Sequence, residues 1–347
     1  MIEPDDFGLS HAATLAHVTD ATPPPSFSVF WNAWRDETFA LEPRLRSARP
    51  DDADPADPSA THQFTGLRHH RIGCTHLRAP GVPRAGVVAL HGYRDIPPLA
   101  QDAQRWAPLS DRGIDVLLVR LRGFPGSTLD APPAPPGTPL FTRGLESAFA
   151  PTPNLMDWHL PRAIADAAAA YLALQSDLHD RAPHAPVYLS GDSFGAGIAV
   201  IAAAQLAHRA DVPRLALSLP SLADWPFRLA IAHPTPGSIT THARDGLASH
   251  PGHAAELTDA LLLTDASLHA RAVRGHVLCM LALRDDAVPA PTQASLFNAL
   301  ASTPAERTRF VVPFGHAEAG LANARLHAAF ERRRFEFLDP ATDPASD

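Results

Sequence analysis

The chain has 347 residues, a formal net charge of −8 and 45% hydrophobic residues. This length and composition predict a globular protein with a packed core, and the negative charge argues against a nucleic-acid-binding role. All 29 basic residues are arginines, which excludes chemistry that needs lysine, such as Schiff-base formation.

Residues 1–6 are acidic, and no apolar core segment of a signal peptide is evident at this end. No run approaches the ~20 apolar residues that a membrane-spanning helix needs. The two cysteines, Cys74 and Cys279, lie far apart in the sequence, so we expect no disulfide framework and a reducing compartment. These features predict a cytoplasmic protein that binds neither nucleic acid nor membrane.

Residues 1–60 are expected to form an N-terminal extension that packs on the core. Within it, residues 26–34 are aromatic with a helical period, which favours a helix docked on an apolar surface. Residues 50–58 are rich in aspartate and proline and predict a loop. Residues 63–77 predict one or two strands.

Strands and helices then alternate along the chain. Apolar runs predict strands at 86–90, 115–120, 186–190, 215–219, 277–283 and 310–312, and helices at 161–174, 196–208 and 318–334. The alternation predicts an α/β fold with a mostly parallel central sheet and helices on both faces. Residues 61–338 would form this main domain, and residues 339–347 a flexible tail.

Two connections, at about 128–156 and 222–272, are longer than ordinary loops. Insertions of this length often form a lid or a wall of a substrate pocket. The second precedes the candidate catalytic acid described below, and we expect it to be helical.

The most informative motif is Gly191-Asp192-Ser193-Phe194-Gly195, which has the Gly-x-Ser-x-Gly pattern of a nucleophile elbow. It stands between a predicted strand and a predicted helix, the context that the motif requires. Side chains at Gly191 and Gly195 would collide with neighbouring backbone in so tight a turn. Ser193 is therefore the candidate nucleophile.

A serine nucleophile needs a histidine base and an acid that orients the base, and in this fold the chain order is serine, acid, histidine. Asp285 and Asp286 follow the strand predicted at 277–283, and His316 follows the last strand. We expect His316 as the base and favour Asp286 as the acid from its spacing to Pro291. The sequence alone does not decide between Asp285 and Asp286, and both could instead cap the next helix.

Stabilisation of an oxyanion needs two donors. The backbone amide of Phe194, directly after the nucleophile, is one candidate. The other is the amide of Tyr93, in His91-Gly92-Tyr93 after the strand predicted at 86–90.

At this point the chain resembles the acetyl xylan esterase and cephalosporin C deacetylase family of α/β-hydrolases. The resemblance runs through residues 26–34, 91–93, 121–127, 141–145, 219–227, Asp286 with Val288 and Pro291, and His316 with Glu318 two residues later. It implies an α/β-hydrolase fold, an oxyanion hole that uses the Tyr93 amide, and hydrolysis of short acyl groups, especially acetyl, from sugars and similar alcohols.

The chain departs from the family pattern at several positions. Phe194 stands where the family has glutamine, Phe124 and Pro125 replace a Gln-Gly pair, and Ala317 stands at the glutamate position after the histidine. The resemblance implies a ring-like homo-oligomer, and the departures at Phe124 and Pro125 leave the oligomeric state open.

The predicted activity is a serine esterase that acts through an acyl-enzyme on a small-molecule ester and needs no cofactor. Two alternatives remain: another hydrolase on the same fold, such as a prolyl-oligopeptidase-like peptidase or a general carboxylesterase, and a non-catalytic hydrolase-fold protein. Histidines such as His69, His70 and His76 lack a metal-binding spacing backed by a carboxylate, so we expect them on the solvated surface and expect no metal site.

Overall fold

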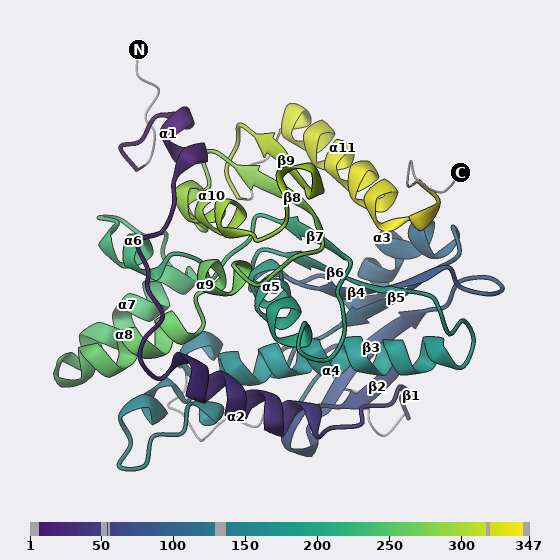
Figure 1. Ribbon diagram of the computed structural model, residues 1–347, viewed down its shortest axis with the longest axis horizontal. Coiled ribbons are helices and arrows are strands. Elements are labelled where there is room, and N and C mark those ends of the chain that lie inside the picture. Colours follow the sequence, from purple (N-terminus) through teal and green to yellow (C-terminus); the bar gives the residue numbers. More distant parts are fainter. Residues whose placement is uncertain (1–6, 50–53, 55, 129–136, 317–319, 343–347) are drawn as a thin grey trace.

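The computed structural model describes residues 7–49, 54, 56–128, 137–316 and 320–342. Within these residues a nine-stranded sheet has the order β1-β2-β3-β5-β4-β6-β7-β8-β9 (Figure 1). The strands are β1 (Arg46–Ser47), β2 (His62–Thr65), β3 (Arg71–Leu77), β4 (Ala85–Leu90), β5 (Ile114–Val119), β6 (Val187–Asp192), β7 (Arg214–Ser218), β8 (His276–Ala282) and β9 (Arg307–Val312).

The six strands from β5 to β9 in this order are parallel, whereas β1, β2 and β3 pair antiparallel at one edge. The central strands β4 and β5 are buried along their whole length. Burial on both faces explains their continuous apolar runs, since parallel sheets are covered by helices on each side. The expected mostly parallel sheet is thus confirmed.

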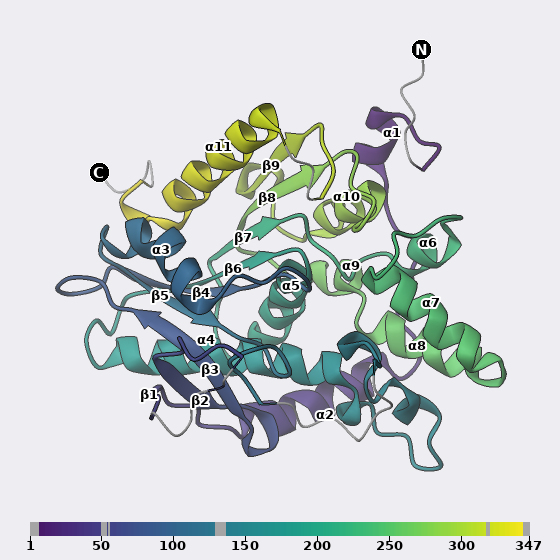
Figure 2. The same ribbon diagram turned by 180° about the vertical axis from the view of Figure 1, so that it is seen from behind.

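Helices cover both faces of the sheet (Figures 1 and 2). They are α1 (His11–Ala16), α2 (Phe27–Phe39), α3 (Leu99–Ser110), α4 (His159–His179), α5 (Phe194–Leu206), α6 (Trp225–Ala230), α7 (Ile239–Ser249), α8 (Ala254–Leu263), α9 (Ala266–Ala270), α10 (Ala290–Ala299) and α11 (Leu321–Leu338). Trp106 of α3 and Phe335 of α11 pack with Val87 on one face. Helices α2, α4 and α5 contribute to the larger core on the other face, which includes Val88.

The N-terminal segment is anchored in the core by two tryptophans of α2. Both are buried, and their indole nitrogens each donate a hydrogen bond of 2.9 Å, Trp31 to the carbonyl of Leu263 and Trp34 to that of Pro161. The aromatic pattern of residues 26–34 therefore belongs to a docked helix. Residues 50–53 and 55 of the expected acidic loop lie outside the described residues, as do residues 343–347 of the expected C-terminal tail.

The two long connections pack against each other. The second contains helices α6 to α9, as the expectation of a helical insertion required. The ring of Phe149, from the first, stacks on His253 of the second with ring centroids 4.1 Å apart. Residues 129–136 of the first lie outside the described residues.

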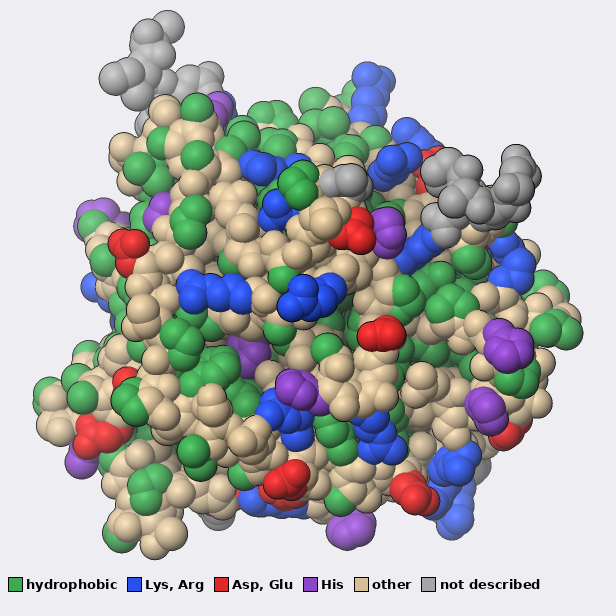
Figure 3. Space-filling model, viewed as in Figure 1, with side chains coloured by type: hydrophobic (Ala, Val, Ile, Leu, Met, Phe, Trp, Pro, Cys, Tyr) green, Lys and Arg blue, Asp and Glu red, His purple; other side chains and the backbone are tan. Residues whose placement is uncertain are grey.

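The surface carries mixed charge. On the face drawn in Figure 3, basic and acidic side chains are interspersed among apolar and neutral ones. In the part of the chain that the structure describes, no helix combines the length and the apolar character needed to cross a membrane.

Candidate active site

Ser193 stands at a strained turn between β6 and α5. Its backbone has φ 52° and ψ −108°, a conformation that residues other than glycine rarely adopt and that is typical of functional sites. The neighbouring glycines make the turn sterically feasible. A Cβ at Gly191 would lie 2.4 Å from the carbonyl oxygen of Gly195, and a Cβ at Gly195 would lie 2.5 Å from that of His91.

The other candidate residues follow the carboxyl ends of neighbouring parallel strands, where α/β proteins place their ligand sites. Tyr93 follows β4, Asp285 follows β8, and His316 follows β9. Ser193, Tyr93 and His316 line one cavity of about 200 Å³. Among the described residues no hydrogen bond joins Ser193 to His316, a contact that in free enzymes is often long and tightens when substrate binds.

His316 is hydrogen-bonded to Asp285, not to Asp286. The distance from His316 Nδ1 to Asp285 Oδ2 is 2.7 Å. Asp285 is fully buried, and its carboxylate also accepts hydrogen bonds from the amides of Ala287 and Val288 and from the side chain of Gln293. The preference for Asp286 drawn from the sequence is therefore wrong as regards the partner of His316.

Asp286 still belongs to the site. It is exposed and lines the cavity, and its carbonyl accepts a hydrogen bond of 2.8 Å from Thr235 Oγ1. The spacing to Pro291 could not separate two adjacent aspartates, because the tight turn after β8 directs one carboxylate inward and the next one outward. Asp285 binds the turn amides as well as the histidine, but it does not cap the next helix, because α10 begins at Ala290 with Pro289 as its N-cap and no side-chain cap.

The surroundings of His316 favour its charged form. Burial opposes the imidazolium and by itself lowers the pKa of His316, but the hydrogen bond and charge of Asp285, together with the charge of Asp286, outweigh it and raise the pKa above its ordinary value. The positive charge of Arg228 acts in the opposite direction. A histidine with this environment is suited to accept a proton and hold it while charge develops.

The two candidate oxyanion donors both come from segments next to the nucleophile. Phe194 is the first residue of α5, so its amide is one of the free donors at a helix N-terminus. The loop with Tyr93 comes close to Ser193, because a Cβ at Gly92 would be 3.8 Å from the Cβ of Ser193. The ring of Tyr93 packs on that of Phe194 with centroids 5.3 Å apart, and its hydroxyl accepts a hydrogen bond of 2.9 Å from the amide of Phe141.

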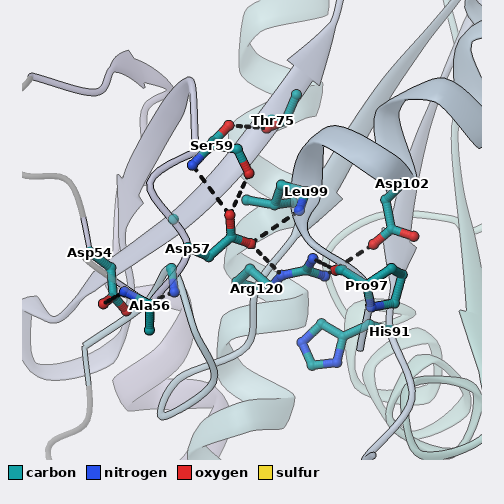
Figure 4. Close-up of polar contacts among 12 residues, drawn as sticks. Asp54, Ala56, Asp57, Ser59, Thr75, His91, Pro97, Leu99, Asp102 and Arg120 are labelled. Carbon is teal, nitrogen blue, oxygen red and sulfur yellow. Dashed lines mark hydrogen bonds and ion pairs between the residues drawn. The ribbon is translucent and has the colours of Figure 1, made fainter. Parts of the chain in front are cut away.

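A buried ion-pair cluster supports the far end of the same loop (Figure 4). Arg120, at the end of β5, donates to the carbonyl of Pro97 and binds Asp102 at 3.1 Å and Asp57 at 3.5 Å. Asp57 in turn accepts from the amide of Leu99 at the start of α3. The loop between β4 and α3 is thus held from the segment before β2 and from β5.

A second ion-pair cluster holds the elbow. Asp192, directly before the nucleophile, binds Arg334 of α11 at 2.6 Å and Arg105 of α3 at 3.1 Å. Burial disfavours the ionised carboxyl, but the two guanidinium groups outweigh burial and hold the pKa of Asp192 well below its usual range. The sequence motif does not predict this contact, because both arginines lie in helices far from the motif in the sequence.

Residues 235–239 of the second long connection form a wall of the cavity. Thr235, Ser238 and Ile239 line it together with Tyr93, and Ala287 and Val288 add apolar surface to the lining. A larger hollow of about 510 Å³ lies between Arg44 and the end of α4, and none of the candidate catalytic residues lines it. The candidate site is therefore the smaller cavity.

Of the histidines expected on the surface, His76 is buried and its Nε2 lies 2.8 Å from Asp115 Oδ2. Asp177 is nearby, so these three side chains could supply metal ligands. Arg181 forms ion pairs with both carboxylates, which neutralises the charge that would attract a cation. The alternating pattern around His76 reflects an antiparallel strand whose two faces are both covered.

One family of known proteins matches most of the chain. The family model described as acetyl xylan esterase (AXE1) matches residues 14–330. A search of curated proteins gave no match.

Two solved structures share the fold. Acetyl xylan esterase 1 from Thermoanaerobacterium sp. JW/SL YS485 is 20% identical, with a TM-score of 0.69 over 94% of this chain and 99% of the other. Acetyl xylan esterase from Paenibacillus sp. R4 is 17% identical, with a TM-score of 0.72 over 93% and 99%. Because the family model covers most of the chain, the protein belongs to the acetyl xylan esterase family and is a carboxylic ester hydrolase with an α/β-hydrolase fold.

Proposed function

We propose that the protein hydrolyses short-acyl esters, of the acetyl type, of sugars or related alcohols through a triad of Ser193, His316 and Asp285. The observation that carries the proposal is the hydrogen bond between His316 and the buried Asp285, at the edge of the cavity that Ser193 also lines. A carboxylate at Nδ1 leaves the other ring nitrogen, Nε2, as the proton acceptor.

The reaction would run in two steps. Ser193 Oγ attacks the ester carbonyl carbon while His316 takes the hydroxyl proton, and the amides of Tyr93 and Phe194 hold the oxyanion. The carbon–oxygen bond to the alcohol then breaks, and His316 gives its proton to the departing oxygen. Water, deprotonated by His316, attacks the acyl-enzyme, and the carboxylic acid leaves as Ser193 regains its proton.

The size of the cavity supports a short acyl group. About 200 Å³ is below the range of ~300–1,000 Å³ for drug-sized ligand sites. The polar residues Ser221 and Ser238 in its lining suit an oxygen-rich alcohol better than a long alkyl chain. Both cysteines are buried free thiols, which supports a location in the reducing cytoplasm.

The test is hydrolysis of p-nitrophenyl acetate, butyrate and octanoate by the wild type and by S193A. We expect kcat/KM to fall as the acyl chain lengthens and activity to vanish in S193A. Octanoate turned over as fast as acetate would contradict the short-acyl specificity. No turnover by the wild type, together with a Ser193 that does not react with a serine-directed phosphonate, would favour a non-catalytic protein.

A further inference from the structure

The loop after β7 brings a second serine to the cavity. Ser221 lines the cavity with Ser193 and His316, and its amide donates a hydrogen bond of 3.0 Å to the carbonyl of Ser193. The proposed mechanism makes no use of its hydroxyl. Ser221 is almost completely buried, with 1% of its surface exposed, and it is the part facing the cavity that a bound ester could reach.

A buried arginine fixes this hydroxyl. Nη2 of Arg228 donates to Ser221 Oγ at 3.0 Å, while Nε and Nη1 donate to the carbonyl of Ala223 and to Thr240 Oγ1, also at 3.0 Å. Arg228 is completely buried. Across the described residues no carboxylate comes within ion-pair distance of its guanidinium, so neutral oxygens are its direct partners.

The contact with Arg228 determines what Ser221 can offer to a ligand. A hydroxyl has one proton to donate and lone pairs to accept with. Arg228 has no acceptor atoms, so Ser221 accepts in this contact, and its own proton remains available. No described residue takes that proton. A hydroxyl that accepts from a buried cation is polarised into a stronger donor.

We propose that Ser221 donates a hydrogen bond to an oxygen on the alcohol part of the substrate and so favours oxygenated alcohols over alkyl alcohols. This inference rests on the proposed function. An acetyl group has one acceptor, its carbonyl oxygen, which the amides of Tyr93 and Phe194 would hold. The acceptors left for Ser221 are therefore on the alcohol side of the ester.

The test uses two acetate esters of equal chain length, 2-methoxyethyl acetate and butyl acetate, which differ by one ether oxygen in place of a methylene. Each kcat/KM, measured by release of acetate, is divided by the rate of hydroxide-catalysed hydrolysis of the same ester, which removes the difference in intrinsic reactivity. We expect the wild type to prefer the methoxyethyl ester about tenfold, as one hydrogen bond provides, and S221A to lose that preference.

T240V is the matched control. Thr240 is buried and gives Arg228 another hydroxyl acceptor, but it is not among the residues that line the cavity. T240V should keep the tenfold preference whatever it does to the melting temperature. S221C, which keeps the size of the side chain but donates weakly, replaces S221A if the alanine variant does not fold.

The outcomes separate the two proposals. A wild type that hydrolyses neither these esters nor p-nitrophenyl acetate would refute the proposed function. A wild type that hydrolyses both esters without a preference, or an S221A variant that keeps the preference, would overturn the role of Ser221 while leaving the esterase function intact. Loss of the preference in T240V as well would assign the effect to the packing around Arg228.

Discussion

The side chain of His91 fixes the orientation of the Gly92–Tyr93 peptide. His91 Nδ1 lies 2.6 Å from the carbonyl oxygen of Gly92, and His91 Nε2 accepts a hydrogen bond of 3.2 Å from the amide of Leu121. Because an amide can only donate, Nε2 is the acceptor and Nδ1 carries the proton. In a trans peptide the carbonyl and the next N–H point in opposite directions, so the Tyr93 amide is directed away from His91.

Substitution of His91 should therefore damage catalysis without a direct contact to substrate. Burial, aided by the charge of Arg120, lowers the pKa of His91 to about 3, so the ring stays neutral in this arrangement at working pH. We expect H91A to lower kcat and kcat/KM together by ~10²–10³, as does loss of one oxyanion donor. Steady-state kinetics with p-nitrophenyl acetate measure this effect. A rise in KM with unchanged kcat would argue against the role.

The adjacent aspartates allow a matched comparison. Asp285 is buried and hydrogen-bonded to His316, whereas Asp286 is exposed at the cavity. We expect D285N to lower kcat by ~10⁴, because an amide leaves the imidazole in the wrong tautomer, and D286N to lower it far less. Both variants should be compared with the wild type after titration of active Ser193 with a phosphonate. A larger loss in D286N would exclude Asp285 as the acid.

The dependence of activity on pH should report His316. The base must be neutral to take the proton from Ser193, so kcat/KM rises as pH increases through the pKa of His316. That pKa is raised, so the midpoint should lie above 6.5. D286N removes one of the charges that raise it and should move the midpoint to lower pH. A midpoint that is unchanged in D286N at low salt, where screening is weak, would contradict this assignment.

The elbow glycines give a steric prediction. An alanine at Gly195 would bring its Cβ to 2.5 Å from the carbonyl oxygen of His91 and 2.6 Å from that of Leu90, so β4 and α5 would have to separate. We expect G195A to lose activity and to melt at a lower temperature. In the control G246A, the nearest atoms that the added Cβ in helix α7 would meet are 3.8 Å away, so activity should be unchanged and the melting temperature should not fall, since alanine favours a helix over glycine. Equal behaviour of the two variants would contradict the steric explanation.

The sequence predicted the elements that carry a strong local signal. Buried strands such as β4 and the helix after the elbow are apolar over their whole length, and the tight turn at Ser193 requires glycines at fixed positions. Helix α3 gave no such signal, because it contains Pro108 and buries mainly Leu99, Trp106 and Leu109 among polar residues. Its N-terminus is held instead by Asp57, a contact across 42 positions that no local pattern encodes.

In the candidate site too, residues with a local sequence signal were predicted and residues that depend on three-dimensional contacts were not. The motif and the chain order selected Ser193 and His316 as candidates, since both depend on local sequence next to a strand end, and the structure brings the two to one cavity. The choice between Asp285 and Asp286 failed because it depends on side-chain direction in one turn. The contact between Ser221 and Arg228 could not be predicted from the sequence, because it forms only when the loop after β7 folds against helix α6.

The ion pairs of Asp192 should make the stability of the protein sensitive to acid. Arg334 and Arg105 lower the pKa of Asp192 in the folded state, so its contribution is present above the unfolded pKa of ~3.9 and is lost as pH falls through the lower folded value. At pH 7, the buried Arg334 of D192N keeps one carboxylate partner, Glu331 at 3.3 Å. We expect the substitution to lower the free energy of unfolding by about 2 kcal/mol.

Thermal unfolding between pH 3 and pH 7 measures this contribution. The difference in melting temperature between the wild type and D192N should be largest near neutral pH and shrink below about pH 4, where the wild type begins to protonate Asp192 on unfolding. D245N, which changes an exposed carboxylate of α7, should show a small difference at every pH. If the difference in melting temperature between the wild type and D192N grows as pH falls, its sign is wrong for a lowered pKa of Asp192. Such a result would show that Arg334 does not depend on the charge of Asp192.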